Sequence, residues 1–542
     1  NMLYNNQSPK QKRERLYSYR QRYVSNWQRV AEFVEPDRRF NLNGAVQEST
    51  PNNEGYIDTT LERALRLNAT GQHELVMPKA SEWFTFTPLA KAADRELVTS
   101  TVDDEYAETA RVVSMFMRNS NLHTASELFF WDRAAYGIGA FWAEWDTRKR
   151  GFSFYSIPVG TFMVDKDKFG RMNMFCWDDW MRNQDIVATF PEKNLPQTVK
   201  DKYMANSNSP DNYLVFHLLE RVERTGDEGL IARADGKEWV LRSVYDATGD
   251  VLLEQFFKNC PVICCNCFDL PNSPYGYGFG KVSLADQIEL VNCLKALAEA
   301  AQQKIFPPML VPEGFQGNIG YGAGEVTTFN PLNIQARPSP LFQQASQTSD
   351  CQWQIERFER VINEACDVNL FMPLLQVKDP QYMKATVAQM IESYSARISS
   401  TAYTRLIEQF LQPLVDFCYN TLVQHGYVRP LRDYHIQFCT PFQILLDRHQ
   451  PTLFTEFLQT VVIPLSQIDP TVLDSVDADY IFRRSMLDIG LSPKYSRPEA
   501  KVQQMRRERQ AAQDEANKMA NAKTFSEVQK NLGAASKDMN LI

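Results

Sequence analysis

The sequence predicts an α+β protein that is mainly helical and has an antiparallel β region in its first half. Apolar residues recur at helical spacing in four early segments, which are 9–34, 58–76, 97–118 and 122–136. Short runs rich in aromatic and branched residues follow, separated by turn signals, at 141–145, 152–157, 162–164, 172–177, 213–222, 238–245, 251–257 and 261–268. Long helical patterns return after residue 280. Helices grouped around a set of antiparallel strands are typical of the α+β class.

The composition is that of a globular protein with several domains. The chain has 542 residues, enough for about three or four domains. Hydrophobic residues make up 44% and charged residues 23%, which excludes a mostly disordered or fibrous chain. The 58 basic and 66 acidic side chains give a net charge of −8. General nucleic-acid binders are usually basic, because phosphate contacts supply their affinity, so we expect no general binder.

No apolar run approaches the ~20 residues that span a bilayer, and the polar, basic start of the chain shows no secretory signal. We therefore expect no contact with a membrane and synthesis in the cytoplasm. In that reducing compartment the ten cysteines are expected to be free thiols.

Local signals support the first helices and the first strand. The segment 9–39 carries nine basic and four acidic side chains, which we interpret as the solvated face of a helix. Asp58 or Thr59 is the expected N-cap of the helix that follows. The alternating polar and aromatic residues at 83–88 favour a strand.

The second half begins with two long helices around an unusual insertion. The segment 281–306 contains no Gly or Pro and as a helix would extend roughly 39 Å. The next segment, 307–342, is dense in Pro, Gly and Asn and has strand-like islands at 309–311 and 325–329. Helical spacing resumes over 350–370. Two long helices that flank such an insertion can hold it away from the main body.

The remainder is predicted to be helical after one loop at 371–384. A very long helical pattern covers 385–425, and Pro413 is expected to kink or break it, because proline lacks the amide hydrogen and clashes with the preceding turn. Shorter helices are predicted within 441–491, and a charged helix over 497–532.

Two motifs have some of the residues that a phosphate-binding loop or a zinc site needs. The segment 276–281 reads Gly-Tyr-Gly-Phe-Gly-Lys, but Tyr275 and Val282 occupy positions where a phosphate-binding loop needs Gly and Ser or Thr. We interpret it as a flexible turn. Cys264 and Cys267 form a C-x-x-C pair without the second pair that structural zinc usually needs, and we expect packed, free thiols. No catalytic, cofactor or metal site is therefore predicted.

Several motifs occur in an order that resembles a known family. They are 58–73 (DTTLERALRLNATGQH), 128–145, 273–278 (SPYGYG), 384–390 (KATVAQM) and 411–415 (LQPLV). Between about residues 17 and 509 their spacing is similar to the podovirus-type portal proteins, the head-to-tail connectors of short-tailed, T7-like phages.

The resemblance implies a structural protein without enzymatic activity. Such proteins form a homo-dodecameric ring at one capsid vertex of the virion. Double-stranded DNA enters through the ring during packaging by the terminase large subunit and leaves through it on ejection. Other implied partners are the major capsid or scaffolding protein, a tail adaptor and internal core proteins.

The resemblance also implies a division of the chain into named parts. In order they are the N-terminal wing with the β region (1–280), the first stem helix (281–306), the clip (307–342), the second stem helix (343–370), the tunnel loop (371–384), the C-terminal wing with the long kinked helix (385–496) and the crown (497–542).

Candidate site residues follow from this division. Lys378 and Lys384 in the tunnel loop are the first candidates for contact with DNA in the channel, and solvent-facing or ion-paired lysines are the alternative. Arg357 and Arg360 on the second stem helix are further candidates. For docking at the clip, the candidates are Phe315, Asn318, Tyr321 and Glu325.

Two other classes of function remain open from the sequence. One is a terminase-type motor enzyme or nuclease, which should show a phosphate loop or a carboxylate metal cluster. The other is an internal core or tail structural protein of the virion.

Overall fold

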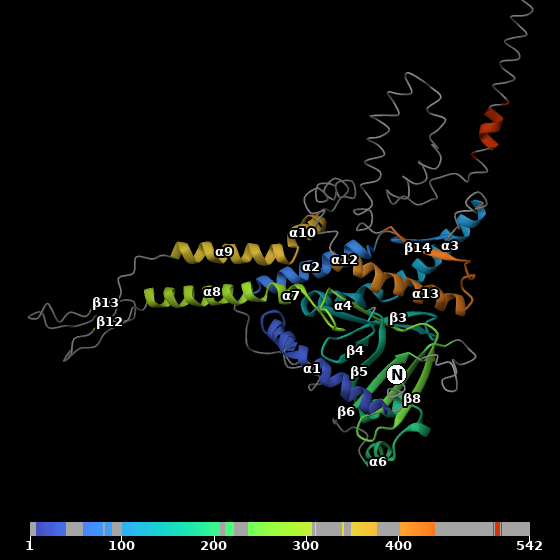
Figure 1. The fold of residues 1–542 in the computed structure, drawn as a ribbon, viewed down its shortest axis with the longest axis horizontal. Coiled ribbons are helices and arrows are strands. Elements are labelled where there is room, and N and C mark those ends of the chain that lie inside the picture. Colours follow the sequence, from blue (N-terminus) through green and yellow to red (C-terminus); the bar gives the residue numbers. More distant parts are fainter. Residues whose placement is uncertain are drawn as a thin grey trace, which may run out of the picture. The chain divides into compact units, whose positions relative to one another are not determined.

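The computed structural model describes most of the chain (Figure 1). The described residues are 7–38, 58–79, 82–88, 100–168, 170–205, 212–221, 237–305, 309–310, 339–340, 348–376, 401–439, 502, 504–509 and 511. The chain divides into two compact units, Asn1–Ser81 with Val113–Val428 and Glu82–Val112 with Arg429–Ile542. Helices and antiparallel sheets confirm the predicted α+β class.

A five-stranded antiparallel sheet in the first unit has the order β4-β5-β6-β7-β8. Its strands are β4 (Phe162–Lys166), β5 (Met172–Arg182), β6 (Asn212–Arg221), β7 (Trp239–Tyr245) and β8 (Val251–Phe257). Helix α1 (Pro9–Val34) packs its Leu16 on one face, in a buried cluster with Phe216. Val215 points to the other face because side chains alternate along a strand, and there it packs with α5 (Asn183–Thr189), η3 (Glu192–Asn194) and α6 (Gln197–Ala205).

The basic residues of α1 bind this sheet. Lys12 Nζ lies 2.5 Å from Glu220 Oε2, and Arg13 donates two hydrogen bonds to Asp178, at 2.7 and 2.9 Å. Arg20 is fully buried and donates to a backbone carbonyl 2.6 Å away. The interpretation of this stretch as a solvated helix face is therefore wrong for these side chains, because carboxylates on the sheet face them.

A second sheet of the first unit has the order β3-β2-β9 and is covered by helices. Its strands are β2 (Ile138–Asp146), β3 (Gly151–Ile157) and β9 (Val262–Asn266), and α4 (Leu122–Tyr136) lies between them and α2 (Thr60–Val76). Gly137, with φ +94°, ends α4 in the left-handed conformation and turns the chain into β2. Of the two predicted caps of α2, Thr59 holds the N-cap position, and the Asp58 carboxylate before it accepts the Thr60 amide at 2.9 Å.

The second unit contains a two-stranded antiparallel sheet of β1 (Phe84–Pro88) and β14 (Tyr434–Phe438). Trp83 stacks on Phe438 beside this ladder. Helix α3 (Ser100–Arg118) begins in this unit, where the Tyr106 hydroxyl donates to the Arg432 carbonyl. Across both units, none of the described helices is long and apolar enough to cross a bilayer.

The two long helices differ from the prediction at their ends. The first is interrupted at Ser283, between α7 (Phe279–Val282) and α8 (Leu284–Ile305). The second spans α9 (Thr348–Ala365), after which Asp367 takes φ +55° and α10 (Val368–Gln376) begins. Residues 371–376 are thus helical, and the loop predicted over 371–384 starts no earlier than 377. Positions 377–384 lie outside the described residues.

Pro413 distorts its helix without ending it. The chain passes from α12 (Thr401–Leu406) through a π-helical turn, η5 (Ile407–Leu411), into α13 (Gln412–Gln424). A proline clashes with the carbonyl four residues before it in a regular helix, and the wider π turn directly before it relieves this clash. Of the two predicted outcomes, a kink or a break, the described residues show no break, and the distortion takes the form of a π turn.

Other predicted elements fall partly or wholly outside the described residues. The strand island at 325–329, the helical pattern over 385–400 and the helices within 441–491 lie outside them. Of the helix predicted over 497–532, residues 504–509 are described and are helical. Residues 309–310 of the other island form β12 (Met309–Leu310).

The interface of α2 and α4 contains a histidine pair that makes stability depend on pH. His73 Nε2 lies 3.2 Å from His123 Nδ1 and 3.3 Å from Ser126 Oγ. Burial, together with the charges of His123 and Lys79, lowers the pKa of His73 to about 4. Between pH 6.5 and about 4 the unfolded chain therefore binds a proton that the folded chain does not.

We expect the free energy of unfolding to fall in that window as the pH decreases, by up to about 3 kcal/mol from His73. Denaturant titrations of the wild type and of His73→Gln at pH 7, 6, 5 and 4.5 measure this, and His73→Gln should fall less steeply. His435→Gln, at an exposed position, is the control. Parallel declines in the wild type and His73→Gln would contradict the assignment.

Candidate functional site: the helix pair α8 and α9

Helices α8 and α9 form an antiparallel pair that leads away from the sheets of the first unit (Figure 1). Near its far end β12 pairs with β13 (Ser339–Pro340). Leu290 and Ile362 are buried at the base of the pair, whereas no side chain in 292–302 or 351–361 is buried. The pair therefore stands free of the rest of the described chain over most of its length.

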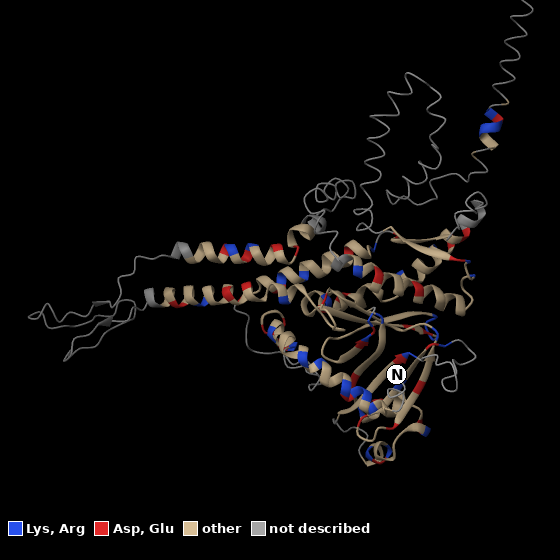
Figure 2. Cartoon of the chain, in the orientation of Figure 1, with Lys and Arg blue, Asp and Glu red and all other residues tan. Residues whose placement is uncertain are grey.

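Over its full length the pair carries more acidic than basic side chains (Figure 2). The sequence of α8 has Asp286, Glu289 and Glu299 against Lys295 and Lys304, a net charge of −1. The sequence of α9 has Asp350, Glu356, Glu359 and Glu364 against Arg357 and Arg360, a net charge of −2. The described surface of the pair would therefore attract phosphate only weakly.

A set of buried polar side chains anchors the base of the second helix. Asn68 and Gln72 lie four residues apart on α2, both fully buried. Asn68 Nδ2 donates at 2.8 Å to the carbonyl of Cys366, where α9 ends, and Gln72 Nε2 donates at 2.5 Å to Asn68 Oδ1. Arg133 of α4 donates to Gln72 Oε1 and, at 3.3 Å, to the Asn266 carbonyl on β9. The end of α9 is thus hydrogen-bonded to two helices and a sheet.

The start of α10 is fixed by close packing on the same helix. Phe371 is fully buried against Gly71 of α2, where an added Cβ would lie 2.2 Å from the ring. Only glycine leaves room for this contact. The helix α10 that follows α9 is therefore attached to α2.

The base of the first helix is fixed by glycines. In the segment 276–281, a Cβ on Gly278 would lie 2.4 Å from the Ala134 carbonyl, and one on Gly280 would lie 2.5 Å from the Ala135 carbonyl. The segment therefore lies directly on the C-terminal turn of α4. The interpretation as a flexible turn is wrong: the glycines are needed for tight backbone packing.

The cysteines at 260–267, which precede the glycine segment 276–281, are free thiols. Cys265 and Cys267 are fully buried, and burial raises the pKa of Cys267 to about 12. Burial likewise raises the pKa of the Cys264 thiol to about 12. These thiols are therefore protonated at neutral pH and pack as small apolar groups.

The structure places only some of the predicted site residues. Arg357 and Arg360 are exposed on α9, one turn apart, and the Arg357 guanidinium lies 5.8 Å from the centre of the Trp353 ring. The candidates Lys378, Lys384, Phe315, Asn318, Tyr321 and Glu325 all lie outside the described residues.

Sequence reasoning missed the polar anchor at the base. Asn68 and Gln72 interrupt the apolar face of α2 at a spacing of four residues, between Leu65 and Leu75. Polar side chains on a buried helix face must find hydrogen-bond partners, so this interruption is the signal that could have located the anchor.

The first unit thus combines sheets and covering helices with a projecting helix pair. Residues 6–495 match the family described as bacteriophage head to tail connecting protein, and the chain belongs to this family.

Two relatives support the family assignment over nearly the whole chain. The chain is 24% identical to the portal protein of Salmonella phage epsilon15, over 95% of its length and 94% of the relative. It is 21% identical to the probable portal protein of Bordetella phage BPP-1, over 93% of its length and 91% of that relative. The resemblance to portal proteins expected from the sequence is confirmed.

The glycine crossing at the base of α8 gives a test of stability. We expect Gly278→Ala to lower the free energy of unfolding by about 1–3 kcal/mol or more, because the new methyl group overlaps the Ala134 carbonyl. Gly151→Ala is the matched control, since its Cβ would meet only the Lys149 carbonyl, at 3.9 Å. Denaturant unfolding of both variants measures the difference. Equal effects would contradict the packing role of Gly278.

Proposed function

We propose that copies of this chain assemble into a dodecameric portal ring at one vertex of the phage head, with α8 and α9 as the stem around a central channel. The observation that carries the proposal is a helix pair free of its own chain in a member of the connector family. Double-stranded DNA passes through the channel during packaging by the terminase and on ejection. The ring is also the platform for tail attachment.

Partly exposed apolar side chains on the pair support assembly with further copies. Leu294 and Leu297 on α8 and Phe358 on α9 are only half-buried, and Trp353 is 62% exposed. Within the described chain nothing buries these side chains further. Neighbouring copies around a ring would cover them, and burial of apolar area favours such association.

The charge of the pair supports passage of DNA through the channel. Each strong phosphate contact adds to affinity, so a basic wall would hold the duplex in place. The described part of the pair is net acidic instead. A few cations at the narrowest level would steady the duplex, and we assign this role to Lys378 and Lys384 of the tunnel loop, with a lesser role for Arg357 and Arg360.

The remaining parts follow the predicted division, with one boundary moved. The wing comprises 1–280 and 385–496, the clip 307–342 and the crown 497–542, and the tunnel loop begins at 377, where the description of α10 ends. We assign docking of the tail adaptor or terminase to the clip through Phe315, Asn318, Tyr321 and Glu325. Capsid or scaffolding protein and internal core proteins are the partners proposed for the rest of the ring.

A motor enzyme is not favoured by any observation. The segment 276–281 that comes nearest to a phosphate loop is packed on α4, and its glycines serve that packing. We propose that the protein is structural and acts without a cofactor.

Assembly can be tested on the exposed tryptophan of the stem. We expect the wild type to form rings with a central hole, and Trp353→Glu to form fewer rings or none, because a carboxylate would be buried between copies. Electron microscopy and analytical ultracentrifugation measure this. Met204→Glu is the control, since Met204 on α6 is 82% exposed and lies outside the stem. A wild type that stays monomeric would overturn the ring.

The tunnel loop can be tested separately from assembly. We expect the double variant Lys378→Ala, Lys384→Ala to form normal rings but to change the amount of DNA packaged or retained in particles, because phosphate contacts are lost. Quantitative measurement of DNA per particle checks this, with the exposed Lys149→Ala as control. Loss of the ring, or unchanged packaging and retention, would contradict the assignment to the loop.

A further inference from the structure

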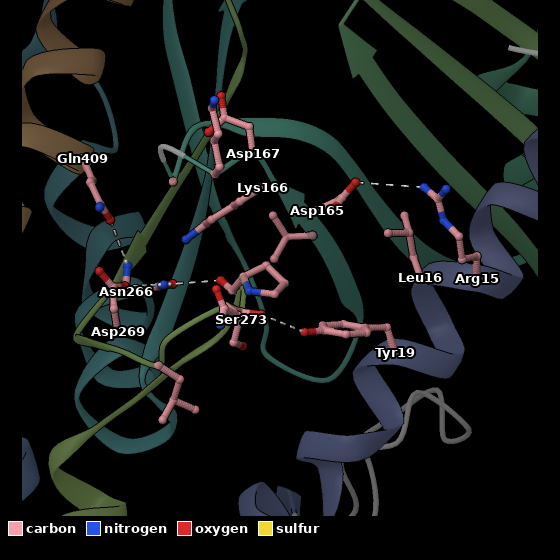
Figure 3. Close-up of a pocket in the computed structure, with 16 residues that line it drawn as sticks. Arg15, Leu16, Tyr19, Asp165, Lys166, Asp167, Asn266, Asp269, Ser273 and Gln409 are labelled. Atoms are coloured by element: carbon pink, nitrogen blue, oxygen red, sulfur yellow. Dashed lines mark hydrogen bonds and ion pairs between the residues drawn. The ribbon is translucent and has the colours of Figure 1, made fainter. Parts of the chain in front are cut away.

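A cavity of about 720 Å³ lies in the first unit, and its lining includes no residue of α8 or α9 (Figure 3). Four parts of the chain meet around it: α1, the β4–β5 turn, the segment after β9 and the π turn η5. Its volume is in the range of about 300–1,000 Å³ that is usual for sites of organic ligands. The cavity is therefore large enough for several residues of a peptide.

Lys166 contributes an ammonium group to this cavity at a break in the sheet. The pairing of β4 with β5 shifts register between Asp165 and Lys166. Such bulges redirect a side chain and are frequent beside functional sites. Burial lowers the pKa of Lys166, and within the described chain its ammonium forms no hydrogen bond or ion pair.

The carboxylates around the cavity are already engaged. Asp165 pairs with Arg15 at 4.0 Å, and Asp269 pairs with Arg405 at 2.9 Å. Asp167 Oδ1 accepts the Arg171 amide at 2.8 Å. The charge of Asp269 also acts on Lys166, but among the described residues no carboxylate forms an ion pair with its ammonium, so an added anion would find a partner here.

Asn266 supplies a second unsatisfied group. Its side chain is 1% exposed, and Nδ2 donates to Asp269 Oδ1 at 2.8 Å and to the Pro274 carbonyl at 3.3 Å. Oδ1 is buried and receives no hydrogen bond from the described residues. An unsatisfied buried acceptor is destabilising, so a donor from a ligand would be favourable here.

Gln409 supplies a donor from the π turn. Its Oε1 accepts the Asn266 amide at 3.3 Å, which fixes the orientation of the side-chain amide and leaves Nε2 for another acceptor. Single π turns inside α-helices are frequent at functional sites. The turn that accommodates Pro413 thus also brings Gln409 to the cavity wall.

We propose that this cavity binds an acidic segment of another polypeptide. An Asp or Glu carboxylate pairs with Lys166, a backbone N–H of the segment donates to Asn266 Oδ1, and a backbone carbonyl accepts from Gln409 Nε2. A short peptide presents all three groups within a few ångströms. Inorganic phosphate also supplies an anion, an O–H donor and acceptor oxygens, so its competition with the peptide is measured directly.

The proposal rests on the geometry of the cavity and not on ring formation, so it is tested on the full-length protein in solution. The probes are acetyl-Gly-Asp-Gly-amide, its Asn analogue and inorganic phosphate. Acylation of Lys166 by an N-hydroxysuccinimide acetate is followed by mass spectrometry, with the exposed Lys149 as internal reference.

We expect the Asp peptide to protect Lys166 at a concentration at least about tenfold lower than the Asn peptide. The reason is that only the Asp carboxylate forms a charged hydrogen bond with Lys166. Phosphate should protect less than the Asp peptide. Equal protection by the two peptides, protection by phosphate at the same concentration, or no protection would each overturn the proposal.

A variant at Gln409 tests the site without changing Lys166, whose acylation is still the measured signal. Gln409→Glu places a carboxylate where the peptide carbonyl would accept, and it should weaken protection by the Asp peptide about tenfold or more. Gln197→Glu on α6 is the matched control and should leave protection unchanged. Unchanged protection in Gln409→Glu would overturn the assignment of Gln409 to the site.

Discussion

A fully buried arginine on α4 must find hydrogen-bond acceptors inside the protein, and this requirement determines how the base of the helix pair is built. Arg133 donates to Gln72 and to the Asn266 carbonyl, and Gln72 in turn holds Asn68 on the carbonyl that ends α9. An unmet hydrogen bond at such depth is costly, so a slip of α2 along α4 or of α9 along α2 is disfavoured. The network therefore fixes the position at which α9 stops.

Glycines also fix the bases of the helix pair, because they permit close backbone packing. Gly71 admits the ring of Phe371, and Gly278 and Gly280 let the chain lie on the last turn of α4 before α8 starts. Both contacts depend on backbone approach that any Cβ would prevent. The two helices of the pair are thus attached at their bases by contacts of different kinds, and a rigid base is what allows the rest of the pair to stand uncovered.

Much of this fold could be predicted from local patterns, and its distortions could not. Aromatic and branched runs predicted the strands, and the helix over 122–136 was predicted to the residue, because periodicity and turn residues are local signals. The break at Asp367 has no such signal, since it depends on the distant Asn68. The π turn before Pro413 and the ion pairs of Arg13 also depend on packing partners that periodicity does not reveal. The candidate site was predictable as a helix pair, but its anchor was not.

The distribution of charge in the chain bears on the channel proposed for the helix pair. The most basic stretch of the first half directs Lys12, Arg13 and Lys10 at carboxylates or carbonyls of its own sheet. Once paired and partly buried, these cations release few counterions from DNA and add little to phosphate binding. Along the described pair, acidic side chains exceed basic ones. In the proposed ring, a chain that neutralises these basic residues internally would surround a duplex with a weakly interacting wall, and the proposed grip on DNA would come from a few cations at one level of the channel.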